Sequence, residues 1–174
     1  MKKLFFTLLL ALISITSVNA QTKMGHVNSQ KVLDTIPSRK AAIAEISYIE
    51  QSGIRDLTVL DSTLQIKYAE YQAKEKTWTE LVRQSEMRKI QELQARIQST
   101  EQSIDRELQA LSAELNKKSL DMVKKAVNTV SALKKLNYVI DESVLLYNSG
   151  GIDITNEVIT EILKLDAATK AAGN

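Results

Sequence analysis

The sequence predicts an α+β protein that is predominantly helical, in which a small β-containing base carries one long antiparallel helical hairpin. Neither glycine nor proline occurs between Gly53 and Gly150, and apolar residues in this stretch recur at steps of seven, which is typical of a helix lying along another helix. Short strand-like runs precede and follow the stretch. Since isolated strands need pairing partners, we expect the chain to turn back so that its two ends meet.

Residues 1–20 have the features of a cleavable secretory signal peptide. Two lysines precede an apolar run, and Val18 and Ala20 occupy the −3 and −1 positions of a plausible cleavage site. The apolar run is too short to span a membrane as a helix. We therefore expect an exported mature chain that begins at Gln21.

The composition of the mature chain excludes several classes of protein. There is no cysteine, so neither a disulfide nor a lipid-modified cysteine can anchor it. Without the two lysines of the signal peptide, the basic residues fall from 23 to 21 and equal the 21 acidic residues. Because it lacks a net basic charge, the mature chain is a poor candidate for a nucleic-acid-binding rod.

The sequence offers no convincing catalytic, cofactor or metal site. His26 is the only histidine, and a metal site needs several ligands. Asp141 and Glu142 are adjacent, so in a strand they point to opposite faces and make a poor acid–base pair. Gly150 and Gly151 lack the spacing of a phosphate-binding loop. We expect neither an enzyme nor a cofactor.

The mature chain opens with the first part of the base, residues 21–37. Residues 24–27 are expected to form a short strand, after which Asn28 or Ser29 caps a short helical turn. Pro37 ends that turn and, with the residue that follows it, starts a long helix.

The predicted arm covers residues 38–135. Its apolar seam consists of two series at steps of seven: Leu57, Leu64, Tyr71 and Trp78, then Ile90, Ile97, Ile104 and Leu111. Gly53 is a weak point, because glycine inside a helix costs about 1 kcal/mol relative to alanine. Local signals allow a straight rod or a hairpin, but the flanking strands favour a hairpin that reverses near residues 79–87. Each of its helices would be roughly 65 Å long at 1.5 Å per residue.

Residues 136–174 complete the predicted base. The run 137–141 predicts one strand, and residues 144–147 a further strand or extended segment before a glycine-containing turn. Thr155 is expected to cap a final amphipathic helix.

So small a base would be marginal as a monomer, and we expect several copies to close their sheets against one another. The candidate residues for that oligomerisation are Met24, Val27, Tyr138, Val139, Ile140, Val144, Leu146 and Ile154.

Both ends of the mature chain resemble the Skp/OmpH family of periplasmic chaperones. The resemblance rests on VNSQKVL near the start, and on YVID followed by LLYNSGGIDIT and an amphipathic helix near the end. It implies a homotrimer whose small β-containing base is the trimerisation domain and whose three arms, the tentacles, surround a cavity. It also implies a periplasmic, ATP-independent holdase that keeps unfolded outer-membrane β-barrel proteins from aggregating.

The charge of this chain departs from that family, whose members are often strongly basic. Residues 117–135 contain six lysines and one acidic residue, whereas residues 136–166 contain six acidic residues and one lysine. We expect the two regions partly to neutralise each other. The resemblance therefore assigns no lipid-binding residue here, and contact with a membrane surface stays open.

The arm offers candidate contacts for an unfolded client away from the seam and toward the tip. The apolar candidates are Ile66, Tyr68, Val82 and Met87, and the cationic candidates, which could attract acidic clients, are Arg83, Arg88 and Lys89. The alternative function is a structural coiled-coil spacer or scaffold of the cell envelope. A spacer needs regular heptads, and we expect Lys67, Lys74 and Gly53 to loosen the seam, which favours the holdase.

Overall fold

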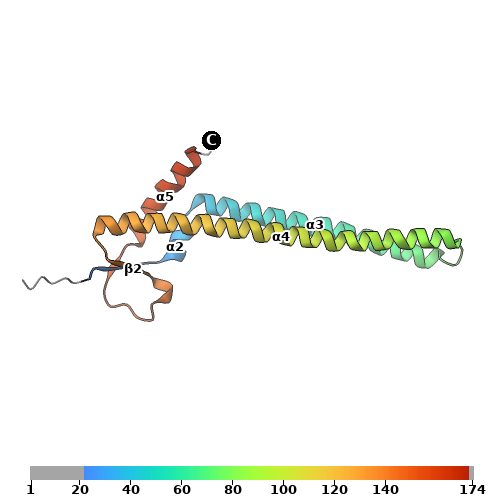
Figure 1. The fold of residues 1–174 in the computed structure, drawn as a ribbon, viewed down its shortest axis with the longest axis horizontal. Coiled ribbons are helices and arrows are strands. Elements are labelled where there is room, and N and C mark those ends of the chain that lie inside the picture. The colour runs from blue at the N-terminus through green and yellow to red at the C-terminus, as the bar shows by residue number, and fades with distance from the viewer. Residues whose placement is uncertain (1–21, 173–174) are drawn as a thin grey trace, which may run out of the picture.

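In a computed structural model that describes residues 22–172, one long helical hairpin extends from a small base (Figure 1). The expected signal peptide lies outside these residues. Among them, no helix has both the length and the apolar character needed to cross a membrane. The elements follow in the order β1 (Met24–Val27), α2 (Ser29–Leu33), α3 (Pro37–Lys74), α4 (Glu80–Lys134), β2 (Tyr138–Asp141), the 3-10 turn η1 (Glu142–Val144), β3 (Ile152–Asp153) and α5 (Thr155–Ala172).

The base contains a parallel three-stranded sheet in the order β2-β1-β3. Met24 pairs with Tyr138 at one end of the β1–β2 ladder, and His26 pairs with Asp153 in the β1–β3 ladder. Parallel neighbours need a long crossover connection, and the whole hairpin lies in the crossover from β1 to β2. The predicted meeting of the two chain ends is thus confirmed.

No strand forms at residues 144–147, where the sequence predicted a further strand or an extended segment. The side chain of Asp141 accepts a hydrogen bond from the backbone N–H of Ser143 at 2.9 Å, and the chain turns there into η1. Leu146 is then fully exposed, and the third strand forms only at Ile152–Asp153, beside β1. A continuous apolar run, Val144 to Tyr147, gave the strand signal, but within residues 22–172 it pairs with no strand.

The core of the base lies on one face of the sheet, under α2, α5 and the last turns of α4. Gly25 and Val27 of β1 face these helices, whereas Met24 and His26 lie on the opposite face, as strand alternation requires. The fully or almost fully buried apolar side chains are Val27, Val32, Ile36, Val123, Ala126, Val130, Ile154, Val158 and Ile162. The arm was expected to extend to residue 135, yet the segment of α4 from Val123 onward belongs to this core.

The helix α5 begins one residue earlier than expected. The carbonyl of Ile154 already accepts the first helical hydrogen bond, from Val158 N–H at 2.9 Å. The carboxylate of Asp153 accepts the N–H of Thr155 at 2.8 Å, while the Thr155 hydroxyl accepts the N–H of Asn28 at 3.0 Å. The expected cap residue, Thr155, therefore joins α5 to the residue after β1.

The arm is formed by α3 and the greater part of α4, which run antiparallel (Figure 1). The chain reverses at residues 75–79, just before the predicted 79–87, because α4 already begins at Glu80. Trp78 lies in this turn and packs edge-on against Tyr71, with ring centroids 5.9 Å apart. An aromatic contact, and no glycine or proline, thus closes the hairpin.

The predicted seam is confirmed. The seam residues of both series are buried or half-buried, and Ile90 is only 1% exposed. Gly53, however, is no weak point: it is buried, and a β-carbon at this position would lie 2.7 Å from Cδ1 of Ile104. The glycine lets the two helices approach closely, and this packing compensates for its poor helix propensity.

Candidate functional site

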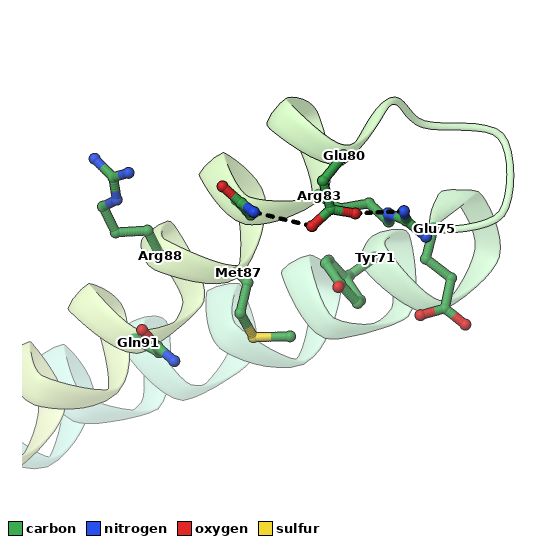
Figure 2. Close-up of a pocket in the computed structure, with 8 residues that line it drawn as sticks. Tyr71, Glu75, Glu80, Arg83, Met87, Arg88 and Gln91 are labelled. Carbon is green, nitrogen blue, oxygen red and sulfur yellow. Dashed lines mark hydrogen bonds and ion pairs between the residues drawn. The ribbon is translucent and has the colours of Figure 1, made fainter.

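The tip of the arm carries a hollow of about 510 Å³ between the two helices. It is lined by Tyr71, Glu75, Glu80, Arg83, Gln84, Met87, Arg88 and Gln91. Figure 2 shows Met87 and Tyr71 on its inner side, where they come from facing helices. Three of the client-contact residues proposed from the sequence therefore lie around one hollow: Arg83, Met87 and Arg88.

The cationic candidates at the tip differ in how far neighbouring carboxylates neutralise them. Arg83 forms an ion pair with Glu80 at 2.5 Å, and Lys89 pairs with Glu86 at 2.7 Å. Hydrogen bonds from Gln84 and then Arg83 hold the pKa of Glu80 below its ordinary value. Within residues 22–172, Arg88 has no such partner. Arg88 is therefore the cation of the three best able to meet an acidic group of another molecule.

The apolar candidates lie mostly on the outside of the arm. Ile66 is 67% exposed and Tyr68 and Val82 about 40%, whereas Met87 is half-buried. The sequence analysis missed further exposed apolar side chains on the arm, namely Tyr48, Ile54, Val59 and Leu81. The sequence did contain a sign of this exposed surface: Val59 and Ile66 are seven residues apart, and each follows a seam residue by two positions. Apolar groups that the hairpin does not bury itself thus occur along the arm.

The face of the sheet that the helices leave uncovered is apolar as well. Of the oligomerisation candidates, Met24, Tyr138, Val144 and Leu146 are exposed and Ile140 is half-buried, whereas Val139 lies on the other face and packs against the core. Tyr147, which the sequence analysis did not select, adds to this surface.

Two of the oligomerisation candidates lie elsewhere. Val27 is 5% exposed and Ile154 is completely buried in the core of the subunit. They stabilise the single chain and offer no surface to a second copy. Sequence alone could not separate the two faces, because strands of only two to four residues are too short to show a clear alternation of apolar and polar side chains.

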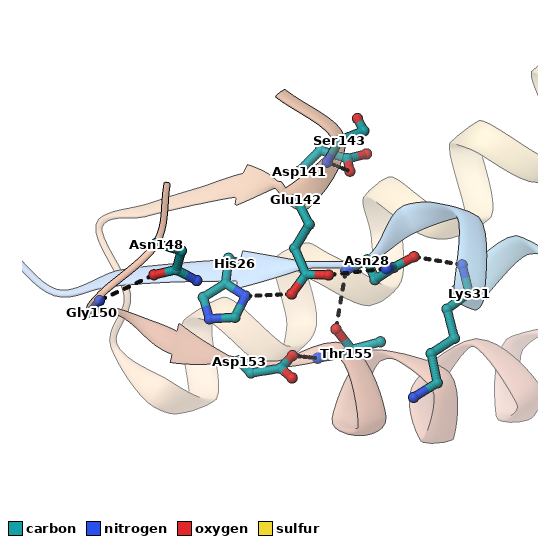
Figure 3. A network of polar contacts seen from close by, with 10 residues as sticks. All are labelled: His26, Asn28, Lys31, Asp141, Glu142, Ser143, Asn148, Gly150, Asp153 and Thr155. Atoms are coloured by element: carbon teal, nitrogen blue, oxygen red, sulfur yellow. Dashed lines mark hydrogen bonds and ion pairs between the residues drawn. The ribbon is translucent and has the colours of Figure 1, made fainter. Parts of the chain in front are cut away.

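A polar network joins the strands on the uncovered side (Figure 3). His26 Nδ1 lies 2.8 Å from Oε1 of Glu142, and the other oxygen of Glu142 accepts a hydrogen bond from Asn28 Nδ2 at 3.0 Å. The pKa of Asp153 is held below its ordinary value by hydrogen bonds from the side chain and backbone of Thr155. Sequence reasoning dismissed His26 as isolated, since Glu142 is 116 positions away.

The lysine-rich end of α4 meets the acidic start of α5 in one direct ion pair. Lys134 Nζ and Glu157 Oε1 are 2.5 Å apart, and this hydrogen bond lowers the pKa of Glu157. This ion pair directly links the two regions that were expected to neutralise each other. Lys118, by contrast, pairs within α4, with Glu114.

Fold and surface together define a class of protein: a small parallel sheet carrying a long helical hairpin that exposes apolar side chains among charges. The chain belongs to the family described as outer membrane protein (OmpH-like), whose match covers residues 23–162. The resemblance found in the sequence is thereby confirmed.

Comparison with solved structures supports the same fold. A crystal structure from Caulobacter crescentus, described as an OmpH-like outer membrane chaperone, superposes with a TM-score of 0.72 at 17% sequence identity. The superposition covers 84% of this chain and 86% of that one. No curated protein matches this chain.

Proposed function

We propose that this protein is an ATP-independent holdase chaperone of the periplasm that keeps unfolded outer-membrane β-barrel proteins from aggregating. Membership in the OmpH-like family and the likeness to a protein described as an outer membrane chaperone both support this function. No nucleic acid and no cofactor enters the proposal.

The observation that carries the proposal is the distribution of apolar surface on the arm. The hairpin buries its own seam, yet it leaves side chains such as Val59 and Ile66 about two-thirds exposed. Spread among charges, such groups can bind many apolar segments weakly and without sequence specificity, as a holdase requires. A spacer needs no such groups.

The working form we propose is a homotrimer. The three-stranded sheet leaves β2 and β3 as open edges, and the face opposite its helices exposes Met24, Tyr138 and Leu146. Joining copies through this side would bury apolar surface and cover unpaired strand edges. Three arms projecting from one base would then enclose a space for a client.

The alternative function is a structural spacer or scaffold of the cell envelope, and the close packing of Gly53 against Ile104 is the observation that favours it. Because this contact makes the seam tighter than the sequence suggested, a loose seam no longer argues for the holdase. The exposed apolar groups remain the feature that separates the two functions.

Native mass spectrometry of residues 21–174, alone and after addition of an outer-membrane β-barrel protein diluted from urea, tests the proposal. A holdase should appear as a trimer that takes up one client and keeps it soluble. A trimer that ignores the client would support the scaffold. A monomer would contradict the proposed assembly.

A further inference from the structure

The sheet brings together three potential metal ligands that are far apart in the sequence. His26 lies on the central strand β1, Glu142 directly follows β2, and Asp153 ends β3. One ligand atom from each lies within 4.8 Å of the other two. Figure 3 shows the imidazole of His26 beside the carboxyl groups of Glu142 and Asp153. His26 and Asp153 lie within strands and Glu142 directly follows one, so the sheet positions all three.

Groups outside this trio hold both carboxylates in place. Asn28 Nδ2 binds one oxygen of Glu142, and Asn28 is itself fixed because its Oδ1 accepts the N–H of Lys31 at 2.8 Å. The N–H of Thr155 binds one oxygen of Asp153. Asp153 therefore keeps a second oxygen for another partner, whereas the second oxygen of Glu142 is the one that lies 2.8 Å from His26 Nδ1. Outer hydrogen bonds of this kind orient the ligands of known metal sites.

Open space lies on the His26 side of the trio, in a hollow that Glu142 and Asp153 do not border. A hollow of about 230 Å³ lies beside His26. It is bordered by Met24, Gly25, Ile140 and the segment from Leu145 to Gly151, apart from Leu146. The side chain of His26 is 14% exposed and that of Glu142 33%, so water can reach the site from one side.

We propose that His26, Glu142 and Asp153 form a binding site for one divalent transition-metal ion, with zinc as its occupant. One imidazole nitrogen and two carboxylate oxygens are a ligand set that zinc accepts, at bond lengths of about 2.0–2.2 Å. Ligand atoms around such an ion stand roughly 3.5 Å apart. The 2.8 Å hydrogen bond between His26 Nδ1 and Glu142 Oε1 therefore has to open, and the exposed Asp153 side chain has to rotate inward. The imidazole disfavours calcium and magnesium, which prefer oxygen ligands.

Binding there would tie the three strands together. The ion would bridge β1 to the residue after β2 and to the end of β3, and so fix both ends of the segment 142–153. That segment carries Val144, Leu146 and Tyr147, whose side chains are largely exposed. Zinc would therefore stabilise the surface through which we expect copies to associate. The metal site itself does not depend on the proposed chaperone function.

The test uses residues 21–174 produced without a histidine tag and freed of metal with EDTA, which is then removed. Titration with zinc chloride in a calorimeter should show one zinc per chain with a micromolar dissociation constant, and magnesium and calcium chloride should bind at least tenfold more weakly. His26→Gln and Glu142→Gln should each weaken zinc binding at least tenfold, as losses around metal sites do. Glu86→Gln, in the arm, is the matched control and should bind like the wild type.

A second measurement needs no variant. Because His26 is the only histidine, the imidazole ¹⁵N signals of the wild-type protein report on this side chain alone. Stoichiometric zinc should shift them. Unshifted signals, or zinc binding that survives in a folded His26→Gln protein, would overturn the site and leave His26 and Glu142 as an ordinary hydrogen-bonded pair. Neither result would bear on client binding.

Discussion

Ile104 of α4 packs directly onto the Cα atom of Gly53 in α3, so that a β-carbon at position 53 would lie 2.7 Å from Cδ1 and 3.1 Å from both Cγ1 and Cγ2 of Ile104. The whole isoleucine side chain is too close for a rotation of its end to relieve the clash. A single pair of residues thus sets how closely the two helices of the arm can approach.

Gly53→Ala should destabilise the arm. Alanine improves helix propensity by about 1 kcal/mol, whereas overpacking costs about 1–3 kcal/mol, so we expect a net loss of about 1 kcal/mol in urea unfolding. Combining it with Ile104→Ala should cost less than the sum of the two single changes, because the small residue makes room. Gly150→Ala, where no atom lies within 4 Å of the new β-carbon, is the control. A Gly53→Ala protein more stable than wild type would contradict the close packing.

Asp166→Ala should loosen the root of the arm. Asp166 of α5 is 3% exposed and accepts a hydrogen bond from the hydroxyl group of Ser38, in the first turn of α3. Its carboxylate also lies 3.4 Å from the backbone nitrogen of Ser38. The residue that caps α3 provides no side-chain hydrogen bond of its own. Loss of this acceptor should cost about 1–2 kcal/mol in thermal or urea unfolding.

The pair can be tested as a double-mutant cycle with Ser38→Ala. The two changes together should cost clearly less than their sum, since both remove one contact. Asp121→Ala, on an exposed position of α4, should leave stability within about 0.5 kcal/mol of wild type. Additive losses at Ser38 and Asp166 would mean that they act independently.

The contribution of Asp153 to stability should disappear at low pH. Hydrogen bonds from Thr155 depress the pKa of Asp153 in the folded state, so its stabilising effect is complete above the unfolded pKa of about 3.9 and is lost as pH falls through the folded pKa. Asp153→Ala should therefore cost about 1 kcal/mol at pH 7 and clearly less at pH 3.

Urea unfolding at both pH values, with EDTA present to exclude metal, measures this difference. Asp56→Ala in the exposed part of α3 serves as the comparison. A cost of Asp153→Ala that is equal at both pH values would show that the carboxylate charge plays no part.

Arg88→Gln should slow client capture more than Arg83→Gln or Lys89→Gln. Arg83 and Lys89 are paired with Glu80 and Glu86, whereas Arg88 has no ion pair within residues 22–172, so its removal takes away the most accessible positive charge. Stopped-flow capture of an acidic unfolded client at low salt should show a several-fold lower rate, and added salt should reduce the difference. If all three variants equal the wild type at low salt, the tip charges do not steer clients.

Val59→Ser combined with Ile66→Ser should weaken client holding without unfolding the arm. Both side chains are about two-thirds exposed, so the double variant should keep the melting temperature of the wild type. Light scattering of a β-barrel protein diluted from urea should then show aggregation at a lower client-to-chaperone ratio. The control is Thr58→Ser with Thr63→Ser, a polar change on the same stretch of α3. Unchanged protection would place client contacts elsewhere.

Sequence periodicity predicted the long helices well, because a heptad pattern is local and repeats along each helix. The position of the reversal was predicted less well, because it was inferred from the flanking strands and not from a local signal: the turn at residues 75–79 contains neither glycine nor proline, and Trp78 packs on Tyr71 there. The strand expected at 144–147 failed for a related reason, since a strand exists only where a neighbour can pair with it.

In the candidate sites, too, local sequence patterns predicted some features and only tertiary contacts decided the others. The sequence predicted apolar and charged candidates at the tip, but which charges are free depends on side-chain pairs such as Arg83 with Glu80. His26 looked isolated because its neighbours come from residues 116 and 127 positions further along the chain. No local pattern connects residues that meet only when three parallel strands align.

By itself the sequence determined the family, the helical hairpin and the strands at both ends, because hydrophobic period and turn chemistry act over a few residues. Only the tertiary structure decided that Gly53 is a packing site, that Asp166 caps a helix 128 positions away, and that His26 lies beside two carboxylates. These features depend on contacts between distant parts of the chain. Such contacts exist only once the hairpin has closed and returned the chain to the sheet.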